Sequence, residues 1–169
     1  MKKSLFITQA AVIAALYVVL TYFINAFGLA NGAIQIRISE ALTILPYFTP
    51  AAIPGLAIGC LLSNLITGCL ATDVIFGTLA TLLGAVGTYA LRRFKWLAPL
   101  PPIVANTIVV PLVLKFAYQL EDAYWFLVLT VGAGEILSCG VLGMMLLFAL
   151  NPARHVLFEG NIGKKAKKA

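Results

Sequence analysis

Apolar residues run through nearly the whole chain, interrupted only by turn residues and short clusters of charge. Hydrophobic residues make up 62% of the sequence and charged residues 11%, and the mean hydropathy is +1.00, which an ordinary water-facing surface does not tolerate. Because about 20 apolar residues cross the hydrocarbon layer once, a chain of 169 residues has room for several crossings joined by short loops. We therefore expect an all-α polytopic membrane protein.

Turn residues and charges divide the chain into an expected six transmembrane helices. The second is short, carries Arg37 and Glu40, and is bounded by Pro46 and Pro50. Such a helix cannot face lipid alone, so it should lie inside the bundle or cross obliquely. The expected spans are 5–27, 36–48, 51–70, 74–91, 102–118 and 123–150.

Basic residues gather at the two ends of the chain and in one loop, which predicts that both termini are cytoplasmic. Residues 1–150 would then form one membrane domain, and residues 151–169 a basic cytoplasmic tail that contacts anionic headgroups. No basic stripe with interleaved aromatics indicates nucleic-acid binding. The basic residues on the expected cytoplasmic side are Lys2, Lys3, Arg92, Arg93, Lys95, Arg154, Lys164, Lys165, Lys167 and Lys168.

Glu135 lies about halfway along the last span, between small residues such as Gly134 and Ser138. An ionised side chain at mid-membrane costs about 2.5–3.5 kcal/mol even on the lenient insertion scale. Glu135 is then either a protonated acid bonded to a neighbouring helix or a ligand-binding group with space beside it. We favour the ligand-binding interpretation.

The other polar residues of the spans each allow two interpretations. Arg37 and Glu40 are three residues apart, so on a helix they either pair with each other or face a ligand together. Asn64 and Asn106 offer donors and acceptors to a heterocycle edge or to another helix. Asp73 is a solvated carboxylate, a helix N-cap or a ligand contact.

Aromatic and small residues are less specific signals. Tyr124, in the aromatic cluster that opens the last span, is either an interface anchor or a stacking surface for a flat ligand. The three cysteines, with no CxxC spacing, are expected to be packing residues. A small-xxx-small stripe on the first span suits close approach by another helix and consists of Ala10, Ala11, Ala14 and Ala15.

Motifs of the common membrane enzymes are absent from the sequence. It has no GxxxxGK[ST] loop, so the chain itself is not expected to hydrolyse ATP. It also lacks HExxH, GxSxG and paired metal-ligand spacings. We therefore expect no catalytic residues, no cofactor and no resident metal, and a protein that is not an enzyme.

Several segments resemble the QueT family, the substrate-binding (S) components of energy-coupling factor transporters for queuosine precursors. The run from Ile36 to Pro46, with Arg-Ile-Ser-Glu-Ala-Leu, is the most specific. It is followed by similar stretches at 49–56, 59–64 and 73–82.

The resemblance implies a multi-pass protein of the bacterial cytoplasmic membrane that binds its substrate from outside. It also implies docking on a membrane coupling protein that two ATPase subunits drive, which would account for the missing nucleotide motif. In such proteins an alanine-rich stripe on the first helix contacts the coupling protein, and the four alanines named above match that pattern.

The implied substrate is a 7-deazaguanine such as 7-aminomethyl-7-deazaguanine, queuine or queuosine. One carboxylate can accept the adjacent N–H donors of the guanine-like edge, and a second can pair with the cationic amine. Glu135, Glu40 and Asp73 are the candidate acids, with Asn64 and Asn106 for the remaining edges.

A self-sufficient secondary transporter or channel is the alternative. It would need coupling-ion sites and usually an internal repeat, and no convincing repeat relates the two halves of the chain. A membrane-embedded enzyme would need Glu135 or Asp73 to act without a metal or a nucleophile partner, and we do not favour it.

Overall fold

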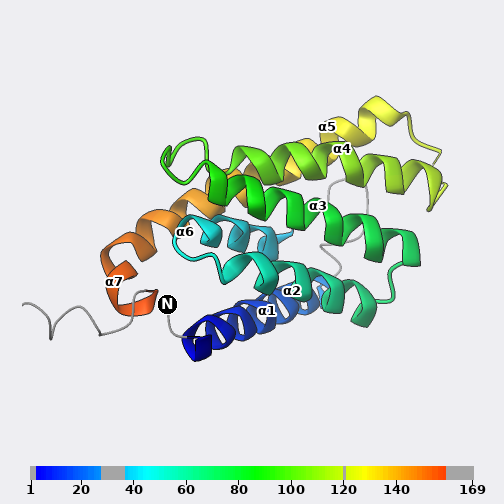
Figure 1. Cartoon of the computed structure of the whole chain (residues 1–169). Helices are drawn as coiled ribbons and strands as arrows, with labels where there is room; N and C mark the ends of the chain where they lie inside the picture. The colour runs from blue at the N-terminus through cyan, green and yellow to red at the C-terminus, as the bar shows by residue number, and fades with distance from the viewer. Residues whose placement is uncertain (1–2, 28–36, 120, 159–169) are drawn as a thin grey trace, which may run out of the picture.

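The computed structural model describes residues 3–27, 37–119 and 121–158, and these ranges contain helices and no strand (Figure 1). A π-helical segment, η2, lies within the last long helix and joins α5 to α6. The elements in chain order are α1 (Lys3–Ala26), η1 (Ile38–Tyr47), α2 (Ala52–Ile66), α3 (Ala71–Ala90), α4 (Leu100–Phe116), α5 (Tyr124–Glu135), η2 (Ile136–Leu142), α6 (Gly143–Leu150), η3 (Asn151–Ala153) and α7 (Arg154–Leu157).

The expected all-α architecture of six helices is confirmed, because α5, η2 and α6 run on as one helix. Three helices are long and apolar enough to span a membrane, namely Lys3–Ala26, Ala71–Ala90 and Tyr124–Leu157. Large apolar side chains are exposed along them, which is the surface that lipid rather than water would cover. The side of the membrane on which the termini lie stays a prediction.

Neighbouring helices in the chain are also neighbours in space. Helix α1 packs on α2, α2 on α3, α3 on α4 and α4 on α5. The short helix η1, drawn in cyan, lies among them and contacts α1, α3 and α6 (Figure 1). This order makes η1 the centre of the bundle.

Helix η1 is short, buried and of the narrow 3-10 type. Every residue from Ser39 to Pro46 is buried, which confirms the expectation that this segment is tucked inside the bundle. Pro46 lacks the N–H that an α-helix would use, and its ring would clash with the preceding turn. A 3-10 helix rises about 2.0 Å per residue, so η1 is too short to cross a bilayer core of about 30 Å.

Glycines of α2 let α1 approach its backbone closely. A Cβ at Gly55 would lie 2.7 Å from the carbonyl oxygen of Ala10, and a Cβ at Gly59 would lie 2.8 Å from Cβ of Tyr17. No side chain fits at such distances, so these two positions set the spacing of α1 and α2. The contact at Gly59 also fixes where Tyr17 stands.

The C-terminal end of the described chain returns to α1. The side-chain amide of Gln9 donates to the carbonyl oxygens of Leu157 (3.0 Å) and Phe158 (3.2 Å). The ring of Phe158 stacks on Phe48 with centroids 5.0 Å apart. The beginning of the expected tail is therefore packed on the membrane domain, whereas residues 159–169 lie outside the described residues.

A buried carboxylate cluster as the candidate functional site

Two carboxylates and a thiol meet in the middle of the bundle. Glu40 of η1, Glu135 at the end of α5 and Cys139 of η2 each place one ligand-type atom within 4.8 Å of the others. Glu40 is 1% exposed and Glu135 is 5% exposed. The structure thus joins two acids that are far apart in the sequence, in surroundings where a charge is costly.

The Glu40 carboxylate is bonded on one side only. The hydroxyl of Tyr17 donates a short hydrogen bond to its Oε1. Its Oε2 is fully buried and has no hydrogen-bond partner among the described residues. An unpartnered buried acceptor costs about 1–3 kcal/mol, and more when it is charged. Such an oxygen is typical of a place where a ligand completes the bonding.

Glu135 is bonded by the thiol that follows it in the helix. Sγ of Cys139 donates to Oε2 of Glu135 at 3.2 Å, and lies 3.4 Å from the hydroxyl of Thr43. The hydroxyl of Ser138, which is 1% exposed, is a second buried polar atom without a partner in the described structure. Ser138 and Cys139 belong to the π-helical segment, a feature found frequently at functional sites.

Asn106 and Arg37 complete the surroundings of the two acids. The side-chain amide of Asn106, on α4 and 3% exposed, interacts with both Glu40 and Glu135. Arg37 lies just before η1 rather than on it, and its charge acts on Glu40 and on Asp73. The helical i, i+3 geometry assumed for Arg37 and Glu40 is therefore wrong, because the helix begins at Ile38.

Asp73 and Asn64 form a second polar pair nearby. Asp73 is 5% exposed and sits inside the first turn of α3, which begins at Ala71. The hypotheses of a solvated carboxylate and of an N-cap are therefore wrong. A Cβ at Gly77 would lie 3.2 Å from Nδ2 of Asn64 and 3.3 Å from Oδ1 of Asp73. The glycine thus leaves room for both polar side chains.

Tyr118, in the connection after α4, holds the start of α3. Its hydroxyl donates to Oδ2 of Asp73 at 3.1 Å and accepts from the backbone N–H of Leu70 at 3.2 Å. The sequence alone identified Tyr118 only as an interface aromatic. In the structure it is the link that fixes the buried Asp73.

The Tyr118 hydroxyl is expected to titrate late. Partial burial and the neighbouring Asp73 carboxylate raise the pKa of Tyr118 to about 12. Because this pKa is raised, the stabilising contribution of Tyr118 is complete below pH 10, the ordinary tyrosine value, and is lost as the pH rises towards 12. Ultraviolet absorbance of the phenolate should show one transition near pH 12 that Tyr118→Phe removes. Loss of that transition from a different tyrosine would contradict the assignment.

The remaining predicted site residues lie elsewhere. Tyr124 begins α5 and packs edge-on against Trp125, about 16 Å along the helix axis from Glu135. It is not part of the carboxylate cluster. The alanine stripe is divided, because Ala14 is buried and Ala10 lies against α2, whereas Ala11 and Ala15 are exposed. Only Ala11 and Ala15 are free to meet a partner.

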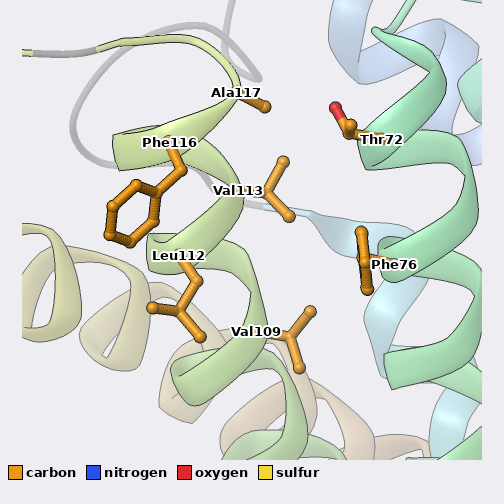
Figure 2. A pocket seen from close by; sticks show the side chains of 7 residues that line it. All are labelled: Thr72, Phe76, Val109, Leu112, Val113, Phe116 and Ala117. Carbon is orange, nitrogen blue, oxygen red and sulfur yellow. The ribbon is translucent and has the colours of Figure 1, made fainter.

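An apolar pocket opens between α3 and α4, near the ends that Tyr118 connects. Figure 2 shows Phe76 of α3 opposite Val109 and Val113 of α4. Its volume is about 530 Å³, and Thr72 supplies the single hydroxyl of the lining. Such a lining suits hydrocarbon and not a polar heterocycle, so we do not place the ligand site there. The lining residues are Thr72, Phe76, Val109, Leu112, Val113, Phe116 and Ala117.

Residues 7–152 match the family model described as QueT transporter. The chain belongs to the QueT transporter family. The match extends from α1 to the end of the last long helix, so the family is defined by the bundle that encloses Glu40 and Glu135. As a member of this family the chain is a membrane protein.

One curated relative is named Queuosine precursor transporter QueT and comes from Lactococcus lactis subsp. cremoris (strain MG1363). It is 39% identical over 93 residues, which is 55% of this chain and 55% of the relative. The matched part thus spans about half the length of each protein. No solved structure matches this QueT family member.

Four side chains of the site were not identified as functional from the sequence. Tyr17 looked like one more residue of an apolar span, and Cys139 like a packing residue. Thr43 and Ser138 gave no signal of their own. The available hint was that Tyr17 follows Ala10 and Ala14 at helical spacing, which places it on the face that packs inward.

Proposed function

We propose that this QueT family protein is the substrate-binding S component of an energy-coupling factor importer and binds a queuosine precursor. The name of the L. lactis relative supports this substrate class. The observation that carries the proposal is the unpartnered, buried Oε2 of Glu40 beside the Glu135 carboxylate. A transporter that must bind a polar heterocycle within an apolar bundle needs such incompletely bonded groups.

The donor and acceptor pattern of a 7-deazaguanine suits these residues. Its guanine-like edge presents adjacent N–H donors, which carboxylates accept well, and further ring acceptors, which an amide can serve. Glu40, Glu135 and Asn106 are the primary contacts. Asp73 and Asn64, linked to the same surroundings through the charge of Arg37, are secondary contacts.

Energy for import would come from partner subunits. The sequence has no nucleotide-binding loop, so the ATPases and the coupling protein are separate chains. Exposed Ala11 and Ala15 form a flat strip on α1 that suits docking of a helix of the coupling protein. The cytoplasmic membrane is the proposed location.

Calorimetric titration of the purified protein with 7-aminomethyl-7-deazaguanine, queuine and queuosine tests the binding step. Glu135→Gln should weaken the affinity for the preferred ligand at least about tenfold, or about 1.4 kcal/mol, because an amide cannot accept a cationic or bidentate donor as a carboxylate does. The matched control is Glu121→Gln, which changes an exposed acid. Equal affinities of the Glu135→Gln and Glu121→Gln variants would contradict the placement of the site.

Uptake into vesicles tests the coupling step. We expect accumulation only when the coupling protein and ATPases are added together with ATP. Accumulation by the chain alone without ATP would instead support a secondary transporter.

A further inference from the structure

The carboxylate cluster carries more negative than positive charge. Glu40 and Glu135 lie together in an apolar interior, and the nearest cation, Arg37, acts on Asp73 as well as on Glu40. Two acids this close repel each other strongly where the dielectric constant is low. A cation placed between them relieves that repulsion, so the bonding left open at the site is selective for charge.

From this arrangement we propose that Glu40 and Glu135 together bind one protonated amine, and that the site accepts 7-deazaguanines with a cationic 7-substituent and rejects neutral ones. The inference rests on the proposed function, because it assigns part of the ligand to part of the site. It goes further by naming the two side chains that share the amine and the class of analogue they exclude.

The spacing of the two acids suits an ammonium group. An ammonium nitrogen about 2.8 Å from each of two oxygens, at a tetrahedral angle, holds those oxygens about 4.6 Å apart. The ligand-type atoms of Glu40 and Glu135 lie within 4.8 Å of each other. Oε2 of Glu40 is already free to accept. A single primary amine can therefore bridge the pair without a large movement of η1 or α5.

Cys139 occupies the other half of this position in the structure. Its thiol donates to Oε2 of Glu135 at 3.2 Å, and a thiol is a weak donor. An ammonium makes a charge-assisted bond about twice as strong as a neutral one, so it displaces the thiol readily. A neutral nitrile or carboxamide cannot repay the loss of carboxylate bonding in the same way.

The same three side chains are also of the kinds that bind zinc. A Zn²⁺ ion about 2.1 Å from each oxygen would draw the two oxygens to about 3.4 Å, so it requires Cys139 as a thiolate ligand and a contraction of the site. An amine needs neither. The variant Cys139→Ala therefore separates the two cations.

The experiment compares two ligands that differ mainly in charge, 7-aminomethyl-7-deazaguanine and the neutral 7-cyano-7-deazaguanine. Dissociation constants are measured on the full-length protein in detergent. We expect the wild type to bind the amine at least about tenfold more tightly. Glu40→Gln and Glu135→Gln should each reduce that ratio below about threefold, mainly by weakening the amine, while Glu121→Gln keeps it.

The outcomes separate this inference from the proposed function. Equal wild-type affinities for both ligands would overturn the charge assignment and leave the function standing, and this comparison needs no variant. Binding of neither ligand would overturn the proposed function itself. Cys139→Ala should retain amine binding. If Zn²⁺ alone bound tightly, lost its affinity in Cys139→Ala and excluded the amine, the cluster would be a metal site and the inference would be wrong.

Discussion

Replacing Gly59 by alanine should lower the free energy of unfolding by about 2–3 kcal/mol, as overpacking of a tight contact does. The new Cβ would lie 2.8 Å from Cβ of Tyr17 and 3.1 Å from the backbone of Ala14. Neither neighbour is a flexible side-chain end, so α1 must move away from α2. The measurement is reversible denaturation in detergent, with the midpoint and slope fitted together.

Gly140→Ala is the matched control for Gly59→Ala. Both glycines lie in helices, but a Cβ at Gly140 would have no neighbour closer than 3.8 Å. Alanine is favoured over glycine in a helix by about 0.8–1.0 kcal/mol, so this variant should be neutral or more stable. If both variants had the same stability, the close approach of α1 and α2 would not be what limits position 59.

Tyr17→Phe should lower the free energy of unfolding by about 1.5–3 kcal/mol, the range for a hydrogen bond to a charged group. It removes the hydroxyl that donates to Oε1 of Glu40 and leaves both carboxylate oxygens without a donor. The ring itself remains, so packing against Gly59 is kept. Denaturation in detergent again gives the value.

Tyr22→Phe, on the same helix, controls for the loss of a phenolic hydroxyl. Tyr22 is 60% exposed, so its variant should match the wild type. A bound cationic ligand should offset part of the Tyr17→Phe loss, because it would donate to the same carboxylate. Equal stabilities of the two variants would mean that the Tyr17 to Glu40 bond contributes nothing to the fold.

The helical bundle could be predicted from the sequence because lipid allows few alternatives. A spanning segment must satisfy its own backbone, so apolar runs with turn residues between them predict helices. Glu40 and Glu135 were also predictable as site residues, because an acid in such a run has a cost that is visible locally. Asp73 was misjudged because α3 begins at Ala71 and so turns Asp73 inward.

Contacts between distant segments could not be predicted. Tyr17 is 23 residues from Glu40, and Cys139 is 99 residues from it. Neither residue type signals a partner on its own. The division of the alanine stripe likewise depends on Gly55 and Gly59, which belong to another helix.

The π-helical turn between Ile136 and Leu142 affects how the last helix can vary in length. A π turn holds more residues than an α turn, so the exposed positions continue at a spacing of four from Trp125 to Met145. Deleting one residue there would restore ordinary winding and rotate everything beyond it by about 100°. Buried Leu147 would then face outward, so this stretch should tolerate substitutions far better than changes of length.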